Sequence, residues 1–145
     1  MTKDIILTIS GLHATDGGSD APIETMTPAQ YYFKNGKHYV VYDEMIEGLE
    51  GAVKSTIKFT ENQVELLRSG MASTRMVFQP GHENMVIYQT PMGPLSISLY
   101  TEEIVSEIGE ERIKLEIEYS LKTEGIVVSE STVNIEVFPK ELLKF

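Results

Sequence analysis

The 145-residue chain contains no cysteine. This absence excludes disulfides, thiol catalysis and cysteine-based zinc sites, and a chain of this length without a disulfide is typical of a reducing compartment. Long apolar runs are also missing, since none approaches the roughly 18 residues that a membrane-spanning helix needs. Residues 1–4 lead directly into a strand pattern, without the apolar segment of a secretion signal. We therefore expect a cytoplasmic protein with no membrane partner.

Positive charge is scarce: the chain has 12 lysines and arginines against 22 aspartates and glutamates, which gives a net charge of −10. Proteins that bind nucleic acids neutralise phosphates with lysine and arginine, so this balance argues against a nucleic-acid partner. The longest candidate for a basic patch is Lys34, Lys37 and His38, around a turn. We interpret this cluster as a solvated hairpin tip. The excess of acid mainly favours solubility.

Catalytic and metal-binding motifs are missing too. The three histidines, His13, His38 and His82, lie in or beside predicted loops and lack the short ligand spacing of zinc sites. His13 has Asp16 and Asp20 nearby, but that loop lacks the alternating acidic pattern of a calcium loop. No Gly-x-Ser-x-Gly elbow and no phosphate-binding glycine loop occurs. We expect no cofactor, no metal site and no enzymatic activity.

The chain does contain a regular alternation of apolar and polar residues, clearest over residues 113–122. A side-chain period of two places one face of a strand against a core and the other in water. With 41% hydrophobic and 23% charged residues, the composition is that of a folded globular protein. The length suits a single domain over residues 1–145.

Turn signals divide this pattern into about ten strands. The strongest signal is Asn35-Gly36, because both central residues of a type I′ hairpin turn need a positive φ. Residues 102–109 have no clear type, Pro139 ends the last strand, and residues 140–145 form one helical turn or a frayed end. The strands are expected at residues 5–9, 24–33, 39–44, 53–59, 64–68, 74–79, 84–90, 95–100 and 113–121, with a last one ending at 137.

Sequential strands joined by tight turns favour an up-and-down meander. A flat meander of this length would leave two exposed edges, an aggregation hazard that barrel closure removes. The fold class is therefore all-β, and we favour an antiparallel up-and-down β-barrel of about 8–10 strands over a sandwich. The interior of such a barrel holds side chains alone or one small ligand. Strands are expected to make up more than ~45% of the chain, against a typical ~20–25%.

Five short runs occur along the chain at residues 39–44 (YVVYDE), 67–70 (LRSG), 76–78 (MVF), 88–95 (YQTPMGPL) and 117–119 (IEY). In this order and spacing they resemble the YwiB-like family of small bacterial proteins, mostly from Firmicutes, which is classed as a domain of unknown function. The resemblance spans nearly the whole chain and implies a calycin-type, lipocalin-like β-barrel. It implies no activity, cofactor or ligand.

Arg68 is a charged residue at a position of its strand where the alternation predicts an apolar one. It lies in phase with Val64 and Leu66, on a face that otherwise consists of core residues. An arginine that points inward needs a partner, because an unpaired buried charge costs several kcal/mol.

Three arrangements satisfy this need. Arg68 can hold the carboxylate of a ligand together with the hydroxyls of Tyr42, Tyr88 and Tyr119, a bidentate task that suits the planar guanidinium. It can instead pair internally with Glu44 and these hydroxyls and fix the register of the barrel. In the third arrangement it lies at the barrel mouth, in solvent.

Two functions therefore remain open. The first is a carrier or sensor that binds a small apolar or carboxylate ligand in a pocket lined by some of the seven methionines and the tyrosines and phenylalanines. The second is an interaction protein that uses a strand face or the barrel rim, with a homodimer as one form. A cavity of several hundred Å³ favours the first function. A filled interior with an exposed apolar patch favours the second.

Overall fold

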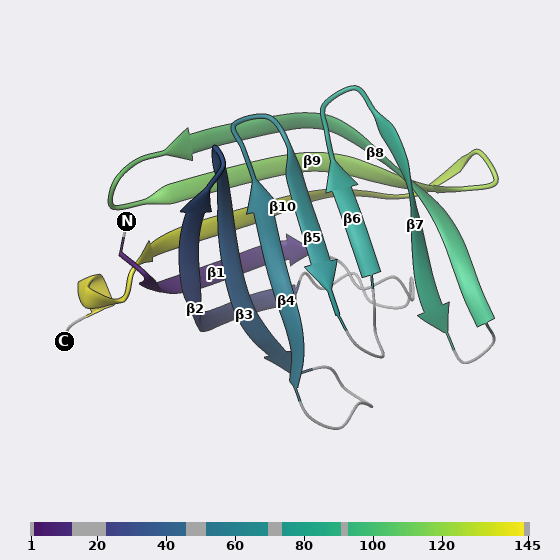
Figure 1. Cartoon of the computed structure of the whole chain (residues 1–145). Helices are drawn as coiled ribbons and strands as arrows, with labels where there is room; N and C mark the ends of the chain where they lie inside the picture. Colours follow the sequence, from purple (N-terminus) through teal and green to yellow (C-terminus); the bar gives the residue numbers. More distant parts are fainter. Residues whose placement is uncertain (1, 13–22, 46–51, 70–73, 91–92, 144–145) are drawn as a thin grey trace.

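The computed structural model describes residues 2–12, 23–45, 52–69, 74–90 and 93–143 (Figure 1). These residues form ten antiparallel strands and one 3₁₀ turn, and the strands cover well over half of the chain, as expected. The elements are β1 (Asp4–Leu12), β2 (Ile23–Lys34), β3 (Lys37–Met45), β4 (Ala52–Phe59), β5 (Val64–Arg68), β6 (Thr74–Phe78), β7 (Glu83–Thr90), β8 (Gly93–Ile108), β9 (Ile113–Thr123), β10 (Ile126–Pro139) and η1 (Lys140–Leu143).

The strands form one sheet in the order β6-β5-β4-β3-β2-β1-β10-β9-β8-β7. Every neighbouring pair is antiparallel, and all but one are consecutive in the chain. The exception is β1 with β10, so the first and last strands pair and the seam of the barrel lies between β6 and β7. Figure 1 shows the sheet curling until these two strands lie near each other. The predicted up-and-down β-barrel is confirmed, and it is nearly closed.

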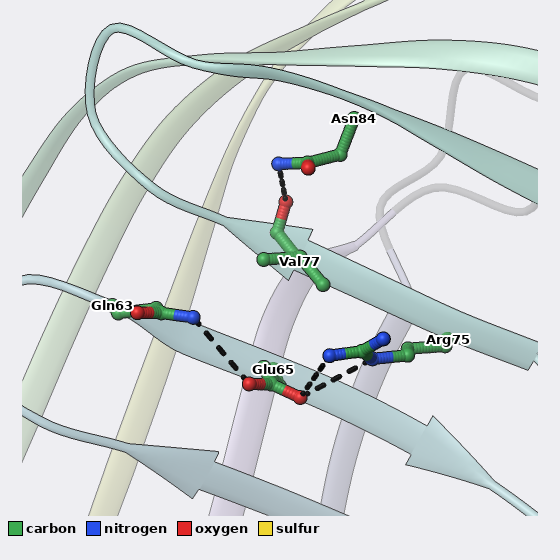
Figure 2. Close-up of polar contacts among 5 residues, drawn as sticks. All are labelled: Gln63, Glu65, Arg75, Val77 and Asn84. Atoms are coloured by element: carbon green, nitrogen blue, oxygen red, sulfur yellow. Dashed lines mark hydrogen bonds and ion pairs between the residues drawn. The ribbon is translucent and has the colours of Figure 1, made fainter.

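The turn after β6 closes the seam at one end. Thr101 of β8, which is fully buried, accepts a hydrogen bond from Gly81 N to its carbonyl (2.9 Å) and donates its own N–H to the carbonyl of His82 (3.2 Å). A side-chain bond from Asn84 Nδ2 to the carbonyl of Val77 (3.3 Å) then joins β7 to β6 (Figure 2). Buried backbone groups need such partners, so these bonds fix where the barrel meets itself.

The long strand β8 extends through a stretch in which the alternation of apolar and polar residues is interrupted. The stretch with no clear type, residues 102–109, continues β8 as far as Ile108. A bulge between Thr101 and Glu103 shifts the pairing with β9 by one residue, and an extra residue of this kind reverses which face the following side chains occupy.

The tight turn between β2 and β3 has the predicted geometry. Asn35 has a φ of 54° and Gly36 a φ of 75°, both in the left-handed region that a type I′ turn requires. At the other end of the chain, β10 runs two residues past the predicted end at residue 137, as far as Pro139, and the 3₁₀ turn η1 follows directly.

Inward side chains from all ten strands form one buried apolar cluster. Val40, Ile57, Val64, Phe78 and Leu99 have no accessible surface. A void large enough for one water would expose the atoms that line it, so the barrel is filled where these residues meet.

Candidate functional site

Arg68 faces the barrel interior, as its phase predicts. It lies directly opposite Ser55 of β4, and Ser55 in turn lies opposite Tyr42 of β3. Residues directly opposite each other in a sheet share a face, so the three form one inward row, which we call the Arg68 row. Ser55 is only 1% exposed, whereas Arg68 and Tyr42 are partly buried.

The backbone around Arg68 is held by β4. Arg68 pairs with Ser55 in the sheet, and the next residue, Ser69, donates both its N–H (3.0 Å) and its hydroxyl (3.2 Å) to the carbonyl of Lys54. The last residue of β5 is therefore fixed in direction.

Arg68 is also the one lysine or arginine on an inward position in the described ranges. The others lie on outward positions of strands or in terminal and turn segments. Charges of this kind stay near water because desolvation is expensive. A cation that instead faces a largely apolar interior needs an anion or several acceptors close by.

The predicted hydroxyl partners occupy different parts of the barrel. Tyr42 lies in the Arg68 row and packs against the core. Tyr119 is 2% exposed, and its ring meets Phe78 edge-on at 5.1 Å. Phe78 lies four residues along β6 from Thr74, the residue opposite Arg68, which corresponds to about 13 Å of strand. The structure therefore brings Tyr42 into the Arg68 row and places the Tyr119 ring in another layer.

The backbones of Glu44 and Tyr88 pair with Val53 and Leu95. The side chains of Glu44 and Tyr88 lie outside the described part of the molecule, so their roles at Arg68 stay predictions. Ser55 was not among the predicted site residues, although its phase with Val53 and Ile57 was a signal for an inward hydroxyl.

A second polar group lies at the end of the barrel where β2 meets β3. The His38 ring stacks on Phe59 at 4.8 Å with an interplanar angle of 10°, and its Nδ1 lies 2.6 Å from the hydroxyl of Tyr31. Burial lowers the pKa of His38 and raises the pKa of Tyr31. The neutral imidazole shares a hydrogen bond with the tyrosine hydroxyl at Nδ1, and both groups stay uncharged near neutral pH.

This geometry corrects one expectation. Lys34 and Lys37 are exposed, as a solvated hairpin tip requires, but His38 is half-buried among aromatic rings. The lysines sit in or next to the turn, whereas the side chain of His38 points toward Phe59 on the inward side of β3. His38 therefore belongs to the end of the core.

Within the described ranges, no three histidine, aspartate or glutamate side chains gather closely enough to hold a metal ion. His82 lies exposed in the turn after β6, and the loop with His13, Asp16 and Asp20 lies outside the described residues. The helical structure in the described ranges includes no segment long and apolar enough to span a membrane.

Chemically, the Arg68 row is suited to a carboxylate. A guanidinium donates two parallel N–H bonds to a carboxylate, and neighbouring hydroxyls can donate to the remaining lone pairs. The next inward row contains Val40 and Ile57, both without accessible surface, so the core begins immediately beyond Ser55.

Comparison with known proteins supports the fold. The family model described as "Domain of unknown function (DUF1934)" matches residues 7–135. The chain belongs to the DUF1934 family. This DUF1934 protein is 32% identical over 106 residues to the "Uncharacterized beta-barrel protein YwiB" of Bacillus subtilis (strain 168). The aligned residues make up 73% of each chain.

The crystal structure of the ywiB protein from Bacillus subtilis has the same architecture. It aligns with a TM-score of 0.77 at 27% sequence identity, over 94% of this DUF1934 chain and 92% of the other. The YwiB-like resemblance inferred from the five short runs is thereby confirmed.

Proposed function

We propose that this DUF1934 protein binds a small carboxylate-bearing molecule at the Arg68 row. The observation that carries the proposal is the position of Arg68, a cation on the inward face of a barrel whose buried cluster is apolar. Tyr42 and Ser55 supply hydroxyls in the same row. In a calycin-type barrel, an inward arginine of this kind would bind a ligand.

The filled core limits the size of the ligand. Val40, Ile57 and Val64 have no accessible surface, so a long acyl chain along the barrel axis would have to displace well-packed side chains. This favours a compact carboxylate whose body lies toward the end of the barrel, over the fatty-acid mode of a hollow barrel.

A second candidate function is protein interaction through a strand face. The observation that favours it is the filled interior together with exposed apolar side chains on the outside, such as Met85 (61%) and Ile87 (52%). Contiguous exposed apolar surface of this kind marks binding surfaces on soluble proteins.

Native mass spectrometry of protein purified from its own host tests the carboxylate proposal. We expect a retained small molecule on the wild type, and Arg68→Leu should weaken its binding by about 2–5 kcal/mol, enough to lose it on purification. Arg75→Leu is the matched control, because Arg75 lies on the outward face of β6 and pairs with Glu65 at 3.2 Å (Figure 2). It should keep the bound mass.

Urea unfolding of the same variants separates the alternatives. If Arg68 serves only to pair with an internal carboxylate and fix the register, Arg68→Leu leaves that buried carboxylate without its partner. The unfolding free energy should then fall by roughly 3–5 kcal/mol. That loss, with no bound molecule on the wild type, would contradict the proposal. If the arginine lies in solvent, neither binding nor stability should change by more than about 0.5 kcal/mol.

A further inference from the structure

The longest uncharged stretch of this acidic chain is residues 84–101, which contain no aspartate, glutamate, lysine or arginine and lie between Glu83 and Glu102. The chain as a whole has a net charge of −10. The stretch forms most of β7 and the first part of β8, next to the seam of the barrel (Figure 1).

The register places the outward side chains of this region in one continuous surface. Met85 lies opposite Ser98, Ser98 opposite Lys122, and Lys122 opposite Val127, across β7, β8, β9 and β10. The neighbouring pair of β7 and β8 adds Ile87 opposite Ser96. We call this surface the apolar face; its members are Met85, Ile87, Ser96, Ser98, Lys122 and Val127.

The large hydrophobic side chains of the apolar face are open to solvent. Met85 is 61% exposed, Ile87 52% and Val127 47%. The next residue of β10, Val128, lies at the bulge between Val127 and Ser129 and is 59% exposed as well. These four, Met85, Ile87, Val127 and Val128, are among the ten large hydrophobic side chains exposed in the described part of the chain.

The apolar face includes one charged position, Lys122, between Ser98 and Val127, and this charge is paired within the chain. The ammonium of Lys122 lies 3.8 Å from the carboxylate of Glu83 and 5.3 Å from the ring centre of Tyr100. The other half of the same sheet is different, because Glu103 lies directly opposite Glu118 there. Acid on acid repels a second acidic molecule.

We infer that the apolar face binds the same face of a second copy of this chain, in a two-fold dimer. Two copies that each have a net charge of −10 repel each other, and the repulsion is smallest where the facing surfaces are uncharged. A two-fold contact places a patch against itself, which an apolar surface whose one lysine is paired with a glutamate accepts. The pair of Lys122 and Glu83 then lies within the contact, where a partner's Glu83 and Lys122 can exchange contacts with it.

The dimer is measured by sedimentation velocity over a range of protein concentrations. The wild type should dimerise, and the dimer should tighten in higher salt because screening weakens the mutual repulsion. Met85→Glu places two like charges in the contact and should raise the dissociation constant at least tenfold. Met26→Glu is the control, because Met26 is 59% exposed on β2 and the change in net charge is the same. It should dimerise like the wild type.

The absence of cysteine gives a second measurement that does not depend on how well a glutamate is tolerated. Met85→Cys and Met26→Cys each carry one thiol, and a short bismaleimide should link two copies of Met85→Cys much faster than two copies of Met26→Cys. A wild type that stays monomeric at every concentration would overturn the inference. This holds also if the apolar face binds a different protein. So would equal loss of the dimer in both glutamate variants, or equal cross-linking of both cysteine variants.

Discussion

Two polar side chains, one near each end of the filled barrel, lie among mainly apolar neighbours. Arg68 faces inward beside the buried hydroxyl of Ser55, and His38 shares a hydrogen bond with Tyr31 while it stacks on Phe59. Each is a group that water would solvate well, held where the neighbours are mainly apolar. Such a position costs free energy unless the group is paired or uncharged, which gives each residue a measurable signature.

For His38 the signature is a pH dependence. Burial lowers its folded pKa below the ordinary 6.5, so the folded state favours the neutral ring. The stability from this effect is fully present above pH 6.5 and is lost as the pH falls below 6.5 through the folded pKa, because the unfolded chain binds the proton first. NMR titration of the His38 ring should give a midpoint below 6.5. A midpoint at or above the ordinary value would contradict the burial argument.

The many carboxylates also titrate as the pH falls, so stability needs a variant as a control. His38→Gln removes the titrating ring at the same position. Between about pH 7.5 and 5.5, either side of the ordinary histidine pKa, its unfolding free energy in urea should fall less than that of the wild type. Equal slopes for the two proteins would show that His38 adds nothing to the pH dependence.

The pairing of β1 with β10 is the element contact that joins the two ends of the chain. It depends on a close approach at Gly11, which has a φ of 87° and sits at a bulge in the register of β1 with β2. A Cβ at Gly11 would lie 2.0 Å from the carbonyl oxygen of Thr132 in β10, a distance at which one strand must move.

Gly11→Ala should therefore destabilise the protein by about 2–4 kcal/mol, from left-handed strain together with overpacking against a backbone atom. Gly36→Ala is the matched control, because Gly36 also has a positive φ but a Cβ added there would meet no atom within 4 Å. Its cost should be the strain alone, about 1 kcal/mol. Equal unfolding free energies for the two variants in urea would mean that the approach of β1 to β10 is not tight.

Elements with strict alternation could be predicted from the sequence, and those set by distant contacts could not. The inward phase of Arg68 and the turn at Asn35 and Gly36 follow from local pattern and were confirmed. The continuation of β8 through residues 102–108 was obscured by the bulge after Thr101, which breaks the period of two. The seam between β6 and β7 depends on the docking of a turn onto Thr101, far along the chain.

The candidate site could be predicted in part, for the same physical reason. Register places Tyr42 and Arg68 in one row because both follow the alternation of neighbouring strands. Tyr119 has the correct phase but contacts Phe78 in a different layer, and phase alone does not give a side chain's height in a barrel. The exposed lysines around His38 concealed the burial of that ring.

At the scale of the whole molecule, the barrel has a filled core, the Arg68 row at one end and the apolar face on its outside. Side chains of all ten strands pack into one cluster, so little of the interior is left for a ligand beyond the Arg68 row. A function based on the interior must therefore be local to that end. The apolar face lies on the outside of β7–β10 and can act independently of it.

The most direct measurement is a map of backbone amide shifts in ¹⁵N–¹H NMR spectra as benzoate, a compact carboxylate, is added to the wild type and to Arg68→Leu. The account predicts shifts that saturate and centre on Tyr42, Ser55 and Arg68, and their loss in Arg68→Leu but not in Arg75→Leu. Shifts that centre elsewhere, for example at His38, or that persist unchanged in Arg68→Leu, would contradict the proposal that the Arg68 row binds carboxylates.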